Sequence, residues 1–185
     1  ALDPAAYDSY KQNLDKAKQL LAEAGYPNGF DTVIETASTY PDMVETAQVL
    51  QQQLKAIGIN ARINQLEWGN YIETWKSKEM SLLVGRNTSG TDSDRSLRFF
   101  FHTEGSANVW NYSNPRFDEL VVTALQTVDQ TERKKLYDEA QKLLVEDAPN
   151  LFLASPKNFS AVRDNVSFQP TAAGESIALL QATVQ

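Results

Sequence analysis

The chain has 185 residues, a net charge of −7 at neutral pH and no cysteine. The acidic balance argues against a nucleic-acid partner, because phosphate contacts need clustered Lys and Arg side chains, and the lack of cysteine excludes disulfides and thiolate chemistry. No apolar run approaches the roughly 20 residues of a membrane span, and the first segment, ALDPAAYDSY, lacks the basic and apolar parts of a secretion signal.

The first part of the chain predicts a helix, a strand and a second helix. The first helix is expected over Tyr7–Ala24, with Gly25 as its stop. The strand is expected over Thr32–Ala37, which is rich in β-branched residues. Asp42 is expected to cap the second helix, which has an apolar stripe at spacings of four and three residues, formed by Met43, Ala47, Leu50, Leu54 and Ile57.

Two further strands differ in their patterns. Ile59–Leu66 alternates apolar and polar side chains, which indicates one solvent-facing side and a place near a sheet edge. Met80–Val84 is nearly all apolar, which is typical of an interior strand covered on both faces. A short helix, Tyr71–Ser77, separates them. This alternation of strands and helices predicts an α/β fold with a mainly parallel sheet, in which the strand order begins second, first, third.

The second half of the chain is predicted to be mainly helical. Helices are expected at Arg95–Phe101, Pro115–Val128 and Glu132–Asp147. Asn114 and Thr131 are expected to cap the last two, and Pro115 suits the first helical position. Leu151–Ala154 and Phe159–Val162 are predicted as strands, which brings the sheet to about five strands.

The predicted strand order places a candidate ligand site. In open parallel sheets, ligands bind beyond the carboxyl ends of the strands, where the order of the strands reverses. Here that point lies between the first and third strands. The candidate ligand-binding residues come from the two loops at that point and from the end of the second strand: Thr39, Tyr40, Trp68, Arg86, Asn87, Thr88, Ser89, Gly90, Thr91 and Asp92. No catalytic residue, metal site or cofactor is expected, since the only histidine, His102, has no evident partner.

A set of motifs occurs along almost the whole chain in one order. They are LLAEAGYPNGFD, LQQQLKAIGINARI, Trp68 with Tyr71, the N–x–x–x–Y–S–N–P–x–x–D stretch Asn108–Asp118, the R–x–x–L–Y–x–x–A–Q helix Arg133–Gln141, and EDAP at Glu146–Pro149. The set resembles the carboxy-terminal part of solute-binding proteins of the peptide/nickel ABC-importer family, of the dipeptide- and oligopeptide-binding type. The resemblance implies a type II periplasmic-binding-protein-like lobe.

The same resemblance implies a function and a domain layout. Residues 1–166 would form the carboxy-terminal ligand-binding lobe of a two-lobe clamp, and residues 167–185 a tail that returns to an amino-terminal lobe outside this chain. The protein would bind a solute, in the first place a peptide, and deliver it to the membrane permease of an ABC importer without chemical conversion. Its place would be the periplasm or the cell surface, as part of a secreted or lipid-anchored parent.

The loop after the third strand departs from the family pattern W–x–G–D–x–x–D–P. Arg86, Ser89 and Ser93 stand at the Trp, first Asp and Pro positions, and Asp92 keeps the second acidic position. In peptide binders the first Asp commonly anchors the ligand's amino group, whereas an Arg favours an anionic or polyhydroxyl ligand. A binder of sugars, opines or related solutes is therefore the alternative on the same scaffold.

An enzyme is the alternative of another class. A doubly wound hydrolase domain would use Asp92, His102 or Ser89. It requires a base beside a nucleophile, and no motif in the sequence supplies that pair.

Overall fold

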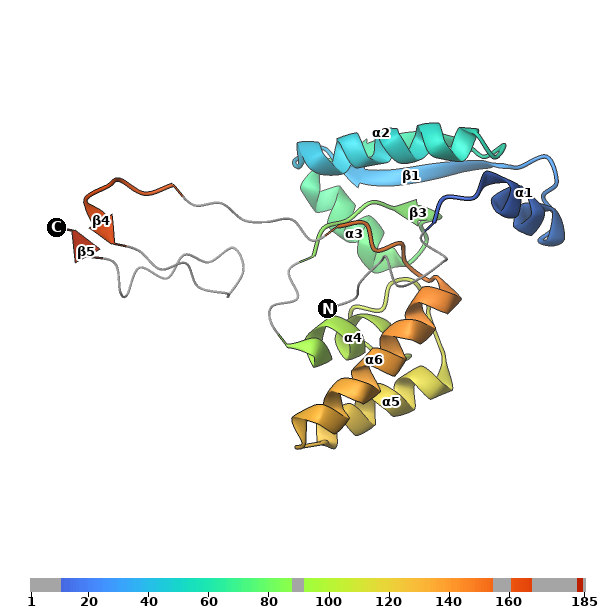
Figure 1. Cartoon of the computed structure of the whole chain (residues 1–185). Coiled ribbons are helices and arrows are strands. Elements are labelled where there is room, and N and C mark those ends of the chain that lie inside the picture. The colour runs from blue at the N-terminus through green and yellow to red at the C-terminus, as the bar shows by residue number, and fades with distance from the viewer. Residues whose placement is uncertain (1–10, 88–91, 155–160, 168–182, 185) are drawn as a thin grey trace. The chain divides into compact units, whose positions relative to one another are not determined.

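The computed structural model describes residues 11–87, 92–154, 161–167 and 183–184 (Figure 1). The chain divides into two compact units. The first unit comprises the residues up to Asn87 together with Val109–Asn111, and the second comprises Thr88–Asn108 together with the residues from Tyr112 onward. The first unit carries the parallel sheet, and the second is mainly helical.

The described part of the first unit contains a three-stranded parallel sheet. Strand β1 (Asp31–Ala37) lies between β2 (Asn60–Leu66) and β3 (Leu82–Leu83), which confirms the predicted order of second, first, third. β1 pairs with β2 along its whole length, from Asp31 opposite Asn60 to Ala37 opposite Leu66. All three strands therefore end at the same edge of the sheet.

Helices connect and cover these strands. Helix α1 (Leu14–Glu23) precedes β1, α2 (Pro41–Lys55) connects β1 to β2, and α3 (Trp68–Ser77) connects β2 to β3. Figure 1 shows α2 along one side of β1 and α3 on the other. The core between them is formed by Ile34, Ala37, Met43, Ala47, Tyr71 and Val84. The apolar stripe that predicted α2 thus supplies Met43 and Ala47 to this core, as expected for an amphipathic helix.

Two glycines set the amino ends of β1 and β2 close together. Gly29 and Gly58 both have positive φ angles, of 75° and 91°. A Cβ atom on Gly29 would lie 1.9 Å from the carbonyl oxygen of Gly58, so the two backbones are in direct contact there. The Asn60 N–H donates to the Phe30 carbonyl at 2.9 Å immediately beyond this contact. The pair thereby fixes the point at which the β1–β2 register begins.

The second unit contains α4 (Ser93–Phe101), α5 (Pro115–Gln126) and α6 (Gln130–Asp147). Helix α5 packs against both α4 and α6. The buried side chains of α5 and α6 are Phe117, Leu120, Val121, Ala124, Tyr137, Ala140, Leu144 and Val145. A short antiparallel pair, β4 (Val166–Ser167) with β5 (Thr183–Val184), also belongs to this unit. No helix in the described ranges is long and apolar enough to cross a membrane.

Two predicted helix caps are wrong. Tyr40, not Asp42, is the N-cap of α2, because Pro41 takes the first helical position and the cap is the residue before it, two positions earlier than predicted. Asp129, not Thr131, caps α6: its carboxylate accepts the N–H groups of Thr131 and Glu132 at 3.0 and 2.9 Å. The capping of α5 by Asn114 is confirmed.

The predicted count of about five strands in a mainly parallel sheet is not reached in the described part of the chain, where the parallel sheet has three. Leu151–Ala154 is not a strand. Leu151 and Leu153 are exposed, and the Phe152 ring meets that of Phe101 at 5.9 Å. Exposed and less exposed side chains therefore alternate in this segment as they do in a strand. A strand also needs a neighbouring strand to pair with its backbone hydrogen-bonding groups. In Phe159–Val162, the first two residues lie outside the described ranges and the last two are not in a strand.

The predicted interior position of the third strand is also not observed. Among the described strands β3 pairs only with β1, and Leu82 is 41% exposed. An apolar run indicates that a strand needs cover on both faces, but it does not reveal which segment provides the cover.

Candidate ligand-binding site

The carboxyl ends of β1 and β2 bring aromatic side chains together. Tyr40 follows β1 after a short turn, and Trp68 follows β2. Their rings meet edge to face with centroids 5.2 Å apart, and Trp68 stacks on Tyr71 at 5.4 Å with the ring planes 13° apart. Ser38 connects the two strand ends, because its N–H and its hydroxyl both donate to the Leu66 carbonyl, at 2.8 and 3.0 Å.

Arg86, just beyond β3, completes this group. Its Cζ lies 5.0 Å from the centroid of the Tyr40 ring, and its Nη1 lies 4.0 Å from Oδ1 of Asp42. The Arg86 side chain is 43% exposed and Trp68 is 38% exposed, so both also face solvent. We call Arg86, Tyr40, Trp68 and Tyr71 the strand-end ledge.

Tyr71 forms the buried base of the ledge. Only 5% of the residue is exposed, and its hydroxyl donates to the Val84 carbonyl at 3.2 Å. Burial raises the pKa of Tyr71 to about 12. A Cβ at Gly85 would lie 2.9 Å from the Tyr71 hydroxyl, so a glycine there makes room for this contact.

This burial leads to a pH-dependent prediction. The folded protein holds the Tyr71 proton more tightly than the unfolded chain, so the resulting stability is fully present below pH 10 and is lost as the pH rises towards 12. We expect wild-type protein to lose up to about 2 kcal/mol more of its free energy of unfolding over this range than Tyr71→Phe does. Urea unfolding across the same range measures the difference. Identical losses in the two proteins would contradict the buried position of the hydroxyl.

The structure thus brings together three of the predicted site residues, Arg86, Tyr40 and Trp68. Thr39 is exposed in the turn before α2, and Asn87 is exposed next to Arg86. Thr88, Ser89, Gly90 and Thr91 lie outside the described residues.

Asp92 belongs to the second unit and serves as the N-cap of α4. It accepts the Asp94 N–H at 2.7 Å, and its other oxygen lies 3.7 Å from Nη2 of Arg133. An Asp that precedes a helix can cap the helix or contact a ligand. The residue type alone therefore does not distinguish between these two roles.

The sequence analysis did not predict two residues of this region as site residues, Asp42 and Tyr71. Asp42, interpreted only as a cap, lies beside Arg86. Tyr71 was left out of the candidate set, although it is three residues from Trp68 on the same helix. That spacing places two side chains on one helix face, and it was the signal that could have found the stacked pair.

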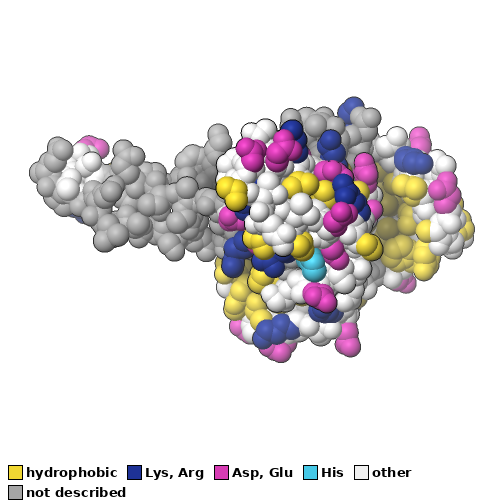
Figure 2. Space-filling model, turned by 90° about the horizontal axis from the view of Figure 1, so that it is seen from below, with side chains coloured by type: hydrophobic (Ala, Val, Ile, Leu, Met, Phe, Trp, Pro, Cys, Tyr) yellow, Lys and Arg dark blue, Asp and Glu magenta, His cyan; other side chains and the backbone are white. Residues whose placement is uncertain are grey.

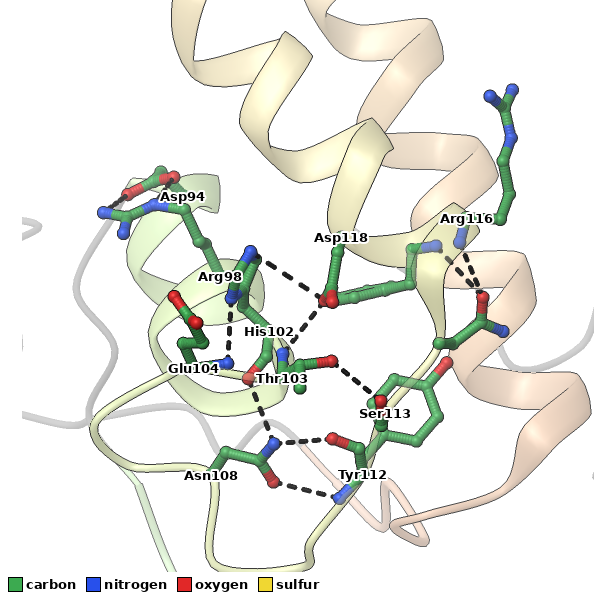
Figure 3. A network of polar contacts seen from close by, with 12 residues as sticks. Asp94, Arg98, His102, Thr103, Glu104, Asn108, Tyr112, Ser113, Arg116 and Asp118 are labelled. Atoms are coloured by element: carbon green, nitrogen blue, oxygen red, sulfur yellow. Dashed lines mark hydrogen bonds and ion pairs between the residues drawn. The ribbon is translucent and has the colours of Figure 1, made fainter.

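A polar network in the second unit contains the only histidine of the chain (Figure 3). Nδ1 of His102 accepts the Glu104 N–H at 3.0 Å, and Nε2 lies 4.0 Å from Oδ1 of Asp118. Since Nδ1 is an acceptor, the proton of the neutral imidazole is on Nε2, facing Asp118. Neither ring nitrogen is then available to take a proton from a nucleophile, so this network does not supply the pair that the hydrolase alternative requires.

Asn108 holds the same network together. It is 2% exposed; its amide nitrogen donates to the carbonyls of His102 and Tyr112 at 3.0 and 2.7 Å, and its oxygen accepts the Tyr112 N–H at 3.2 Å (Figure 3). The residue therefore closes the turn between α4 and α5. This role is structural.

Within the described residues, no group of three or more His, Cys, Asp or Glu side chains could hold a metal ion. Both carboxylate oxygens of Asp94 are engaged, since they accept hydrogen bonds from Arg98 at 2.8 Å. On the face drawn in Figure 2, acidic and basic side chains are interspersed.

Open parallel α/β sheets bind ligands beyond the carboxyl ends of their strands, and ligand sites are lined mainly by apolar and aromatic side chains with a few polar groups. Comparison with known proteins leads to the same class of protein, one that binds ligands. The bacterial extracellular solute-binding proteins, family 5 (middle region), match residues 2–108, and the chain belongs to this family. The sequence-based family assignment and fold class are confirmed.

Individual relatives give the same result. The chain is 31% identical over 165 residues to the glutathione-binding protein GsiB of Pectobacterium atrosepticum, covering 84% of this chain and 32% of the relative. It is similar to the structure of the ABC transporter-associated periplasmic binding protein DppA from Helicobacter pylori in complex with the peptide STSA, at 35% identity and a TM-score of 0.69 over 76% of this chain and 28% of that one.

A third relative covers more of the chain. It is the dipeptide binding protein from Pseudoalteromonas sp. SM9913 in complex with Met-Leu, at 30% identity and a TM-score of 0.78 over 92% of this chain and 35% of that one. The chain therefore spans about a third of the length of the relatives that it matches.

Proposed function

We propose that this chain is one lobe of an extracytoplasmic protein that captures peptides and delivers them to the permease of an ABC importer. The observation that carries the proposal is the strand-end ledge, with Trp68 and Arg86 partly exposed at the carboxyl ends of parallel strands. Support comes from family relatives in complex with the peptide STSA and with Met-Leu, and from a relative named for glutathione binding.

The proposal includes the domain layout and location. Residues 1–166 form the carboxy-terminal lobe, and residues 167–185 return to an amino-terminal lobe. The two lobes close on the solute as a clamp, in the periplasm or at the cell surface, in a secreted or lipid-anchored parent. No bond is made or broken, so the lobe acts by binding alone and needs neither a catalytic residue nor a cofactor.

The ledge offers two kinds of contact to a peptide. The Trp68 and Tyr40 rings present flat apolar surface, and aromatic contacts of this kind contribute about 1 kcal/mol beyond the area that they bury. Arg86 presents N–H donors beside these rings. One lobe provides only part of the enclosure, so we expect weak binding by this chain alone and tight binding when both lobes are present.

A substitution at Trp68 tests the proposal. In the full-length protein, we expect Trp68→Ala to weaken peptide binding by about 2 kcal/mol, or roughly thirtyfold, because a central aromatic contact is removed. Phe30→Ala is the matched control. Phe30 is 37% exposed against 38% for Trp68, but it precedes the amino end of β1.

Isothermal titration with defined di- and tripeptides measures both variants. Equal effects of Trp68→Ala and Phe30→Ala, or no effect of Trp68→Ala, would contradict a peptide site at the strand ends.

Arg86 favours a second candidate function, the capture of sugars, opines or other anionic or polyhydroxyl solutes on the same ledge. A thermal-shift screen of the full-length protein with peptides, sugars and opines separates the two candidates, since a ligand of the native state raises the melting temperature. Stabilisation by peptides alone supports the first candidate, and stabilisation by sugars or opines alone supports the second.

A further inference from the structure

We propose that Tyr71 is a positioning residue of the strand-end ledge: it fixes the orientation of the Trp68 ring, and the oriented ring makes the lobe prefer peptides that carry an aromatic side chain. The inference rests on the proposed function. It adds a property of the captured peptide that the lobe selects and the contact that sets this selection.

Trp68 stacks on a neighbour that is much more deeply buried than Trp68 itself. The two rings are nearly parallel, at 13° with centroids 5.4 Å apart, and Tyr71 is 5% exposed against 38% for Trp68. The two residues lie three positions apart at the start of α3, so their side chains share one helix face. Tyr71 is therefore the fixed support of the pair, and Trp68 is the member that a ligand can reach.

The Tyr71 hydroxyl connects this support to the third strand. It donates to the Val84 carbonyl at 3.2 Å, and the Val84 N–H in turn donates to the Glu35 carbonyl of β1 at 2.9 Å. The acceptor of the hydroxyl is thus held by the sheet. Because the hydroxyl is at the far end of a rigid ring, this hydrogen bond restricts the tilt of the whole ring, and with it the tilt of Trp68 stacked on it.

Gly85 leaves the space that this hydroxyl occupies. A Cβ there would lie 2.9 Å from the hydroxyl oxygen of Tyr71, too close for a real Cβ atom, whereas the next side-chain atom, Cδ2 of Leu83, would lie at 4.0 Å. Gly85 is not among the described glycines with a positive φ angle, so the backbone conformation does not require a glycine at this position. An alanine would therefore displace the hydroxyl without changing the chemistry of either ring.

The exposed surface of Trp68 determines which side chains it selects. Tyr71 covers part of one face of the indole ring, and the Tyr40 ring contacts it at 79° with centroids 5.2 Å apart. The part that remains exposed is flat and apolar, and these two neighbours set its direction. Aromatic side chains gain most from such a surface, because ring pairs add a favourable electrostatic contact to the apolar area that they bury.

A purely structural role of Tyr71 gives a different expectation. A buried tyrosine that only fills the core would change the stability of the first unit when it is substituted, and it would leave the choice among bound peptides unchanged. If Tyr71 acts through Trp68, its substitution changes this choice. The relative binding of two kinds of peptide therefore distinguishes the two roles.

Competition between two peptide pools tests the inference in the full-length protein. Both pools are tripeptides of Gly, Ala and Ser in random order, and in one pool a single position is replaced by Phe, Tyr or Trp. The protein is mixed with equal amounts of both pools, and the bound peptides are counted by mass spectrometry. We expect wild-type protein to enrich the aromatic pool by about tenfold, and Trp68→Ala to bring the ratio to about one.

Three further variants separate the hydroxyl of Tyr71 from its ring. Gly85→Ala should lower the ratio to about two, because the added Cβ displaces the hydroxyl and the ring with it. Tyr71→Phe should give about five, since the ring stays and only its hydrogen bond is lost. Gly85→Ala combined with Tyr71→Phe should recover the value of Tyr71→Phe alone, because the added Cβ then meets no hydroxyl.

Tyr137→Phe is the matched control. Tyr137 is also 5% exposed, but it belongs to α6 in the second unit, and its substitution should keep the wild-type ratio. The ratio is measured within one sample, so partial unfolding of a variant does not change it. If Gly85→Ala yields no folded protein, Tyr71→Leu replaces it: this variant removes the stacked ring and should lower the ratio to about two.

The outcomes are distinguishable. A ratio for the double variant above that of Gly85→Ala alone supports the inference. If peptides bind but wild-type protein shows no preference for the aromatic pool, if Gly85→Ala or Tyr71→Leu keeps the wild-type ratio, or if the double variant does not recover, the inference is overturned and peptide capture stands. If neither pool binds, both proposals are overturned.

Discussion

Gly29→Ala is expected to destabilise the first unit by about 3 kcal/mol. The residue has a φ of 75°, where an L side chain costs about 1–2 kcal/mol. Its new Cβ would also lie 1.9 Å from the oxygen and 2.3 Å from the carbon of the Gly58 carbonyl. Both are backbone atoms, so relief requires moving the amino ends of β1 and β2 apart, which adds a further 1–3 kcal/mol as in overpacked cores.

Gly25→Ala is the matched control for this prediction. Gly25 has a similar φ of 89°, but nothing lies within 4 Å of its added Cβ. We expect a loss of about 1 kcal/mol, from the backbone conformation alone. Urea unfolding of the two variants, followed by circular dichroism, measures the difference. Equal losses would show that the contact between Gly29 and Gly58 does not set the start of the sheet.

Asn108→Ala is expected to destabilise the second unit by about 3 kcal/mol. The substitution removes three hydrogen bonds at a residue that is 2% exposed, and it leaves the His102 and Tyr112 carbonyls and the Tyr112 N–H without the side chain that they contact. Each buried polar group that loses its partner costs about 1–3 kcal/mol, although local relaxation recovers part of this.

Asn114→Ala tests whether burial is the cause. Asn114 also makes several hydrogen bonds, since it accepts the N–H groups of Arg116 and Phe117 and donates to Asp147, but it lies at a half-buried helix start. We expect about 1 kcal/mol, the usual loss for an N-cap asparagine. Unfolding midpoints in urea measure both variants. A loss for Asn108→Ala no larger than that for Asn114→Ala would contradict the closing role of Asn108.

Local periodicity predicted most elements because it records which side of each segment is buried. The stripe on α2 places Met43 and Ala47 in the core, and the alternation of β2 reflects its place at the sheet edge. The order of the strands followed from the contrast between that alternating strand and the apolar one. This order in turn brought Arg86, Tyr40 and Trp68 together, because parallel strands send their carboxyl ends to one edge.

Features that depend on a distant partner were harder to predict. Leu151–Ala154 has the alternation of a strand, but hydrogen bonding to a neighbouring strand is decided elsewhere in the chain. The N-caps of α2 and α6 depend on the exact residue at which each helix begins. A helix start can move by one or two residues at little energetic cost. The contact of Asp42 with Arg86 joins the first turn of α2 to the segment after β3, which is far away in sequence, and has no local signal.

Hydrogen exchange of the full-length protein, with and without a saturating pool of free-carboxyl tripeptides, tests the central claim most directly. We expect peptide binding to slow exchange at Ser38–Tyr40, at Trp68 and at Arg86–Asn87. The amino ends of the same strands border an open groove lined by Asp31, Thr32, Val33, Asn60, Ala61 and Arg62, and their exchange should not change. Slowing at that groove, with no change at the strand-end ledge, would contradict the proposed peptide site.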